Sequence, residues 1–135
     1  MNQDNRIAIV HDFFRTWEQS MSNLRPYLTD DVVWWSRWGS LGIDNFDAVV
    51  PGVKANLAKP IKFTVHRVVA QGDLMAVEAG AKTALKSGAE YDQDYHFLFE
   101  FSGDKIKLVR EHFDTKHAYE VWGSALAEYV PAIKS

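Results

Sequence analysis

Residues 90–114 constrain the fold of this chain more than any other stretch. Their sequence, EYDQDYHFLFEFSGDKIKLVREHFD, predicts two long antiparallel strands joined by a turn at residues 102–104. In the first strand aromatic residues occupy one parity and ionisable residues the other, so the two kinds of side chain point to opposite faces. Ionisable groups also crowd the end of the second strand, from Arg110 to Asp114. A hairpin that only supported a core would not need so many titratable groups, and we therefore predict that it forms the wall of a pocket.

The composition limits the chain to one domain of globular type. Its 135 residues are 47% hydrophobic and 13% aromatic, which is far from the composition of a disordered protein. The net charge is -3, and lysine and arginine are spread singly along the chain. Nucleic-acid surfaces need clustered basic residues, so a nucleic-acid partner is not expected.

Cysteine is absent, which excludes a disulfide framework, a cysteine-ligated zinc site and a cysteine nucleophile. No apolar run approaches the roughly 18–20 residues of a membrane span, so no membrane association is expected. The first residues form a polar start followed by an amphipathic pattern rather than a signal peptide. We expect a cytoplasmic protein.

The first half of the chain is mainly helical in pattern. Apolar residues spaced by three and four predict a helix over residues 4–21, with a core-facing stripe of Ile7, Val10, Phe13, Phe14 and Trp17. A short turn near residues 24–28 and a β-rich run at 32–38 follow. A further helix is expected at about 46–57, capped by Asp44 or Asn45 and kinked or split by Pro51.

The second half changes to a period of two. Strands are predicted at residues 61–70 and 74–85, followed by the hairpin and by a helix at 115–122 with Asp114 as its cap. Helices first and a strand meander afterwards predict an α+β fold, in which one curved, mainly antiparallel (mixed) sheet wraps around the N-terminal helices. Such a sheet encloses a cone suited to a ligand. We expect one domain over residues 1–135, with a core at about 5–122 and a weakly specified tail at 123–135.

Three segments carry a resemblance to a known family. They are YLTDDVVWW at the start of the first strand, YDQDYHFLFEFSGDKI in the hairpin and VREHFDT at its end. In this order they resemble the SnoaL-like, ketosteroid-isomerase-like branch of the nuclear transport factor 2-like superfamily. The resemblance implies a cone-shaped pocket and a homodimer formed through the convex face of the sheet. It does not imply one activity, because this fold hosts isomerases, cyclases, dehydratases, epoxide hydrolases and non-catalytic binders.

Ketosteroid isomerase uses a carboxylate base and an oxyanion hole made of a tyrosine and a protonated aspartic acid. By alignment with that family, the base position falls on Ser36, the tyrosine position on Phe14 and the aspartic acid position on His96. Serine cannot act as a carboxylate base, and a phenyl ring cannot donate a hydrogen bond. Steroid isomerisation by the usual site is therefore not expected.

His96, Glu111 and Asp94 are the candidate proton carriers. His96 could be a general base or a donor to a carbonyl group, with a buried structural histidine as the alternative. Glu111 matches the glutamate of the family's R-E-Y ending, and desolvation in an apolar cone would raise its pKa; the alternative is a surface ion pair. Asp94 shares the parity of His96 and could orient its imidazole, or it could simply lie at a solvated strand end.

A larger set of residues is expected to shape the cavity or contact the ligand. Adjacent tryptophans on a strand point to opposite faces, so one of Trp34 and Trp35 can enter the pocket while the other meets the exterior or a partner subunit. The parity of the strand at 90–101 stays open, because a bulge would exchange the two sets of side chains. The expected ligand-binding residues are Phe14, Trp17, Trp34, Trp35, Glu78, Tyr91, Tyr95 and Phe113.

No spacing typical of a metal site appears among the histidines and carboxylates. We therefore expect no metal and no cofactor. The favoured hypothesis is acid–base catalysis of isomerisation, cyclisation or dehydration on a small apolar or carbonyl-containing ligand. The alternatives are a non-catalytic binding protein with the same cone and a protein-interaction domain that uses the exposed face of the sheet.

Overall fold

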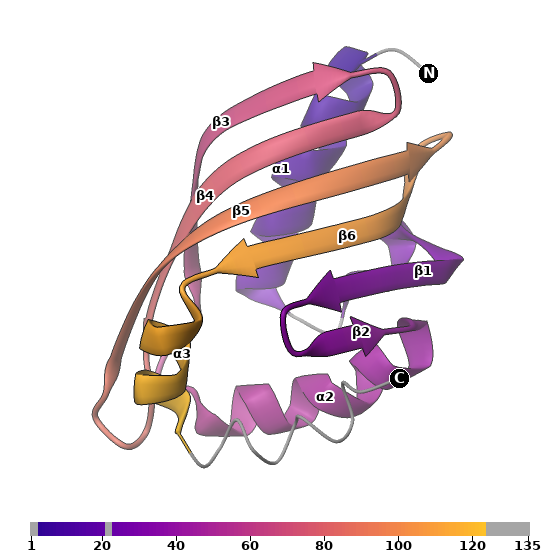
Figure 1. Cartoon of the computed structure of the whole chain (residues 1–135). Coiled ribbons are helices and arrows are strands. Elements are labelled where there is room, and N and C mark those ends of the chain that lie inside the picture. Colours follow the sequence, from indigo (N-terminus) through magenta and orange to yellow (C-terminus); the bar gives the residue numbers. More distant parts are fainter. Residues whose placement is uncertain (1–2, 21–22, 124–135) are drawn as a thin grey trace.

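A computed structural model describes residues 3–20 and 23–123 (Figure 1). Residues 124–135 of the predicted tail at 123–135, and residue 21 at the end of the helix predicted over 4–21, lie outside these residues. The α+β fold is confirmed. The elements in chain order are α1 (Gln3–Gln19), the short 3-10 helix η2 (Arg25–Tyr27), β1 (Leu28–Ser36), β2 (Gly39–Leu41), α2 (Ile43–Asn56), β3 (Lys62–Gln71), β4 (Leu74–Ala84), β5 (Glu90–Ser102), β6 (Lys105–Phe113) and α3 (Thr115–Trp122).

The strands form one curved six-stranded sheet in the order β2-β1-β6-β5-β4-β3, and α1 crosses its concave face (Figure 1). Neighbouring strands are antiparallel except β1 and β6, which are parallel and make the sheet mixed. The parallel pair brings the N-terminal strand beside the end of the hairpin. Residues far apart in the sequence therefore share one region of the concave face.

The core lies between α1 and the long hairpin β5–β6. The aromatic stripe of α1 packs onto the aromatic parity of β5, with ring centroids 5.5 Å apart for Phe13 and Phe99 and 5.2 Å apart for Phe14 and Phe97. Both phenylalanines of α1 are buried, as are Phe97 and Phe99. Burying this aromatic parity is strongly favourable. The aromatic residues of β5 consequently face the helix, and its ionisable residues face outward.

Two details of the segment that follows β1 differ from expectation. The chain at Gly39–Leu41 forms a short strand, β2, which pairs with β1. Helix α2 begins at Ile43 after Gly42 and has no side-chain cap, so the predicted cap at Asp44 or Asn45 is wrong. The helix starts earlier than its apolar pattern indicated, which puts Asp44 inside its first turn. Pro51 lies within α2, and the predicted split of that helix does not occur.

Helix α3 has the predicted bounds and cap. The Asp114 carboxylate accepts hydrogen bonds from the backbone N–H groups of Lys116 and His117, at 3.0 and 3.3 Å. Gly123 ends the helix with a φ of 49°, a left-handed conformation that suits glycine. α3 and α2 lie near each other at the same end of the sheet (Figure 1).

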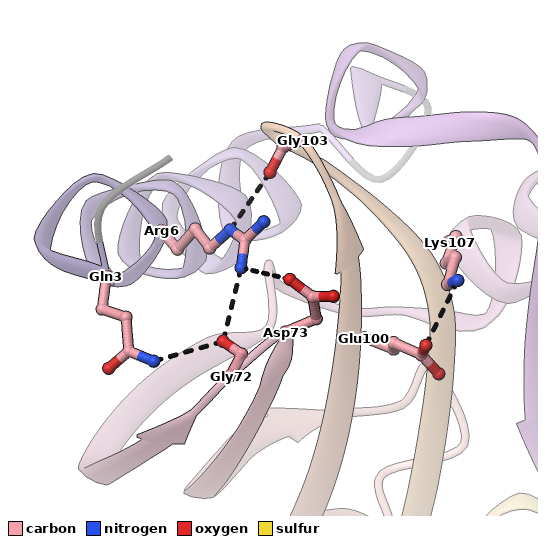
Figure 2. A network of polar contacts seen from close by, with 7 residues as sticks. All are labelled: Gln3, Arg6, Gly72, Asp73, Glu100, Gly103 and Lys107. Atoms are coloured by element: carbon pink, nitrogen blue, oxygen red, sulfur yellow. Dashed lines mark hydrogen bonds and ion pairs between the residues drawn. The ribbon is translucent and has the colours of Figure 1, made fainter.

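At the start of α1, Arg6 joins the helix to two hairpin turns (Figure 2). Its side chain donates to the Gly103 carbonyl at 3.1 Å, to the Gly72 carbonyl at 3.4 Å and to the Asp73 carboxylate at 2.9 Å. The guanidinium also lies over the Phe101 ring, 5.2 Å from its centroid. Arg6 is only 7% exposed, and this set of partners compensates its buried charge.

Candidate active site

A cavity of about 160 Å³ lies between the concave face of the sheet and helices α2 and α3. A cavity of about 150 Å³ with apolar walls accepts a molecule the size of benzene. This cavity therefore has room for a compound with one small ring. Most of its walls are aromatic or aliphatic; the lining residues are Trp17, Trp34, Ser36, Trp38, Gly39, Leu41, Val49, Val50, Val53, Ile61, Tyr91, Tyr95, Glu111, Phe113, Ala118 and Trp122.

Among the described residues that line the cavity, Glu111 carries the only carboxyl group. Strand pairing places it between Ser36 of β1 and Phe97 of β5. The Trp34 indole donates a hydrogen bond to Glu111 Oε1 at 3.0 Å. Burial raises the pKa of Glu111 from 4.5 to about 7, and the Trp34 hydrogen bond opposes this rise by stabilising the carboxylate. Near neutral pH this carboxyl group is therefore poised both to accept and to donate a proton.

Two tyrosines on β5 provide hydroxyl groups at the same cavity. The hydroxyls of Tyr91 and Tyr95 are hydrogen-bonded to each other at 2.8 Å. Burial raises the pKa of Tyr91 to about 12 and that of Tyr95 well above its usual range, and the Glu111 charge adds to both shifts. Both phenols stay protonated at neutral pH. They are therefore hydrogen-bond donors rather than proton acceptors.

Behind the tyrosines, Gln93 is 1% exposed. Its Oε1 accepts from the backbone N–H groups of Asp114 at 3.0 Å and Asp94 at 3.1 Å. Its Nε2 donates to the Asp114 carbonyl at 2.9 Å and to the Tyr91 hydroxyl at 3.3 Å. The amide thus joins β5 to the residue that caps α3. It also contacts the hydroxyl pair directly.

The structure places His96 and Asp94 on the outer face of the sheet, where both are exposed. Neither lines the cavity. The parity that holds Tyr91, Gln93 and Tyr95 faces inward instead, because the aromatic residues of β5 must pack against α1. Alignment with ketosteroid isomerase assigned the acid position to His96, and an error of one residue in a strand moves a side chain to the opposite face. The placement of His96 and Asp94 in the pocket is therefore wrong.

Of the expected ligand-binding residues, Trp17, Trp34, Tyr91, Tyr95 and Phe113 line the cavity together with Glu111. Three others do not. Phe14 is 2% exposed and belongs to the packed core beneath α1. Trp35 and Glu78 lie on the outer face, where Trp35 contacts the Arg110 guanidinium at 3.9 Å from its ring centroid and Glu78 pairs with Arg67 at 3.3 Å. Trp34 and Trp35 thus point to opposite faces, as predicted.

Sequence reasoning missed much of the lining. Trp38 packs against Phe113 with ring centroids 4.9 Å apart, and Trp122 contacts Tyr91 at 5.9 Å. The apolar positions of α2, including Val49 and Val53, were assigned to a helix but not to the cavity. A signal was present for Trp122, since a large aromatic at the end of a short amphipathic helix needs a surface to cover. Nothing local indicated that α2 would close the same space.

Within residues 3–20 and 23–123, no group of three or more His, Asp or Glu side chains comes together as metal ligands would. None of the helices in this part of the chain is long and apolar enough to cross a membrane. Glu111 is the exception to an otherwise apolar or hydroxylic cavity. The chemistry that these groups support is proton transfer and hydrogen bonding.

Comparison with known proteins adds a family and a fold. The family model described as SnoaL-like domain matches residues 10–109. No match is found among curated proteins. Among solved structures, an NTF2-like protein of unknown function from Burkholderia pseudomallei superposes with a TM-score of 0.78 at 16% identity, covering 90% of this chain and 98% of the other.

Two further structures share the fold. An LEH-like epoxide hydrolase from M. tuberculosis gives a TM-score of 0.73 at 17% identity, covering 95% of this chain and 97% of the other. A protein with a ketosteroid isomerase-like fold from Catenulispora acidiphila, in complex with trimethylamine, gives 0.73 at 16% identity, covering 85% and 92%. At such identities the likeness establishes the NTF2-like fold, and the activity has to be argued from the site.

Proposed function

Because the chain belongs to the SnoaL-like domain family, we propose that it catalyses acid–base chemistry on a small, largely apolar carbonyl compound bound in the cavity. The observation that carries this proposal is Glu111, a single carboxyl group in an aromatic cavity whose burial raises its pKa to about 7. A group with such a pKa exchanges protons efficiently at neutral pH, because both of its forms are populated. The enzyme needs no cofactor for this chemistry.

In the proposed reaction the Glu111 carboxylate takes a proton from the carbon next to the substrate carbonyl. The C–H bonding electrons move into a new carbon–carbon double bond, and the carbonyl electrons move onto oxygen to give an enolate. The protonated Glu111 then returns its proton. In an unsaturated ketone, return of the proton to a different carbon of the dienolate is isomerisation. Return to a hydroxyl group on the next carbon, which leaves as water while the carbonyl re-forms, is dehydration. Attack of the enolate carbon on a second carbonyl of the same molecule, whose new alkoxide takes the proton, is cyclisation.

Exchange of substrate hydrogen with solvent tests this proposal before the natural substrate is known. One-ring ketones such as cyclohexanone and cyclohex-2-enone are incubated with the protein in deuterated water, and deuterium at the carbon next to the carbonyl is followed by NMR. We expect catalysed exchange whose rate rises with pH through about 7, because the carboxylate is the active form. Glu111→Gln should lower the rate by about 10²- to 10⁴-fold, the usual contribution of a general base.

The matched control is Glu78→Gln, which removes a carboxylate paired with Arg67 on the outer face and should leave exchange unchanged. Equal rates for wild type and Glu111→Gln would refute the proposal. Quenching of tryptophan fluorescence by these ketones without any exchange would instead identify a non-catalytic binding protein.

We also propose that the outer face of the sheet forms a homodimer interface. Strand pairing aligns one outward row across five strands: Val69, Ala76, Leu98, Arg110 and Trp35. Val69 is 61% exposed and Val33, beside this row on β1, is 43% exposed. Ala76, Leu98, Arg110 and Trp35 are half-buried. A partly exposed, largely apolar row across a sheet is typical of a protein interface. Sedimentation should give a dimer for the wild type and a monomer for Val69→Glu; a monomeric wild type would refute this proposal.

A further inference from the structure

The buried amide of Gln93 has one defined orientation. Its Oε1 accepts from two backbone N–H groups, those of Asp94 and Asp114. An inverted amide would place its NH₂ group against these two donors and leave them unpaired in the interior. The NH₂ group must therefore face the Asp114 carbonyl and the Tyr91 hydroxyl, at 2.9 and 3.3 Å. Both hydrogens of Gln93 Nε2 are thus committed.

This orientation favours one direction for the hydrogen bond between the two tyrosines. Either hydroxyl can donate across the 2.8 Å contact, but the Tyr91 oxygen accepts from Gln93, which makes the Tyr91 hydroxyl the better donor toward the Tyr95 oxygen. Hydrogen bonds that run in one direction along a chain strengthen one another. Among the described residues the Tyr95 hydroxyl has Tyr91 as its one hydrogen-bond partner. The Tyr95 hydrogen is consequently left at the end of the chain, on a residue that lines the cavity.

Tyr95 and Glu111 lie on the same wall of that cavity. Tyr95 pairs with Phe113 and Phe97 pairs with Glu111, so Tyr95 and Glu111 are diagonal neighbours on the inward face of β5 and β6. The Glu111 oxygen Oε1 is already occupied by the Trp34 indole. A ligand between them meets one fixed donor, the phenol, and one group that can change its protonation state, the carboxyl.

We propose that Tyr95 donates a hydrogen bond to the carbonyl oxygen of the substrate, and that Gln93 is a positioning residue that fixes this donor through Tyr91. This deepens, and rests on, the proposed function: the substrate is a neutral one-ring ketone or enone whose oxygen accepts from Tyr95 while its neighbouring C–H faces Glu111. The enolate that forms after proton loss carries more charge on oxygen than the ketone does. The hydrogen bond therefore strengthens as the reaction proceeds.

The stretching frequency of a bound carbonyl group tests the donor without requiring turnover. Cyclohexanone with and without a ¹³C label at the carbonyl is bound to the protein, and the infrared difference spectrum isolates its C=O band. We expect a shift to lower frequency on binding to the wild type and loss of that shift in Tyr95→Phe. The affinity should also fall by about three- to tenfold in this variant, the usual value of one neutral hydrogen bond.

Tyr91→Phe tests the relay and keeps the hydrogen bonds of the Gln93 amide to the backbone of Asp114, although it removes the Tyr91 acceptor. We expect a smaller shift than in the wild type, because Tyr95 keeps its hydrogen but loses the neighbour that polarises it. Tyr119→Phe is the matched control; Tyr119 is 66% exposed on α3 and the band should not move. Methylenecyclohexane, which has the shape of the ketone without the acceptor oxygen, should bind wild type and Tyr95→Phe alike.

The absence of a frequency shift in the wild type, or an equal shift in Tyr95→Phe, would overturn the assignment of Tyr95. A shift that survives Tyr95→Phe but vanishes in Tyr91→Phe would make Tyr91 the terminal donor and overturn the direction of the relay. An unchanged shift in Tyr91→Phe would remove Gln93 from the proposal. These outcomes are separate from failure of the proposed function, which is an unchanged deuterium exchange rate in Glu111→Gln.

Discussion

Arg6 and Glu111 are both ionisable side chains withdrawn from solvent, and they lie toward opposite ends of strand β6. Arg6 sits at the turn that precedes the strand, where two carbonyl groups and one carboxylate accept from the guanidinium (Figure 2). The guanidinium also lies over the Phe101 ring. Glu111 lies near the end of the strand, where Trp34 supplies its one hydrogen bond among the described residues. The same fold therefore contains one buried charge that is fully compensated, Arg6, and one half-buried carboxyl group with little compensation, Glu111.

This difference separates a structural role from a functional one. Full hydrogen bonding of a buried ionisable group stabilises its charged form and holds the surrounding elements in place. In a carboxyl group that is withdrawn from water and accepts only one hydrogen bond, desolvation destabilises the charged form. Its pKa therefore rises, and the neutral form becomes populated. We infer that Arg6 holds α1 to the hairpin turns and that Glu111, in the cavity wall, is available for the proposed proton transfer.

The largest expected effect on stability is that of Arg6→Ala. The substitution removes the donor of the Gly103 carbonyl and the ion pair with Asp73, and leaves the Gly72 carbonyl with Gln3 as its remaining donor from α1. We therefore expect the free energy of unfolding to fall by about 3 kcal/mol. Urea denaturation measures this change. The matched control is Arg15→Ala, which removes an arginine of the same helix that pairs with Asp12 and is 63% exposed; it should cost less than about 0.5 kcal/mol. Equal costs for the two variants would contradict a clamp at Arg6.

Glu111→Gln should act on stability in the opposite direction, and only at high pH. The pKa of Glu111 is 4.5 when unfolded and about 7 when folded, so the folded state holds its proton more tightly. The stabilisation of the folded state that comes from this tighter proton binding is fully present below pH 4.5 and is lost as pH rises through about 7. We therefore expect Glu111→Gln to match the wild type below this window and to exceed it above by up to about 3 kcal/mol.

Denaturation of both proteins across this pH range isolates Glu111, because all other groups titrate alike in the two. If the difference in unfolding free energy between the wild type and Glu111→Gln does not change with pH, Glu111 is solvated like an ordinary surface carboxylate. Glu78→Gln, which removes a carboxylate on the outer face, is the matched control.

The smallest expected effect is that of Lys107→Gln, which tests the other ion pair in Figure 2. Lys107 and Glu100 are joined at 3.2 Å, but their side chains are 46% and 32% exposed. Solvent and salt screen such a pair, so the loss in unfolding free energy should be below about 0.5 kcal/mol. A loss above about 1 kcal/mol that persists in high salt would contradict the comparison of Arg6 with Glu111. It would show that burial and the number of hydrogen-bonding partners do not together decide how much a charged side chain contributes to stability.

Much of the fold follows from local pattern. The hairpin, the α1 stripe, the bounds of α3 and its Asp114 cap were all predicted, because they depend on side-chain period and on residues close in sequence. Glu111 was also predicted, through its match to the family's R-E-Y ending, which implied the same parity as Val109 and Phe113, and it lines the cavity. Arg6 was missed, although it lies four residues before Val10 on the buried stripe of α1. A charge at an apolar position was the available signal.

The inward face of β5 shows where the pattern had to be combined with physics. The sequence places Tyr95 and His96 on opposite faces but does not by itself say which face is inside. Tyr95 faces inward because it shares its parity with the other aromatic residues of β5, whose burial is favourable. Alignment with ketosteroid isomerase had instead favoured His96. In the same way the sequence showed that Trp34 and Trp35 point to opposite faces, but not which of the two faces the cavity.

The sequence by itself determined the element types, their order, the α+β architecture and the presence of a carboxyl group on the apolar parity of β6. Only the tertiary structure decided that α2 and α3 leave a cavity against the concave face of the sheet. It also decided that Gln93, Tyr91 and Tyr95 join into one chain of hydrogen bonds. It also decided how many partners Arg6 and Glu111 each obtain. The reason is that side-chain period is a local property, whereas compensation of a buried polar group depends on residues brought together from distant parts of the chain.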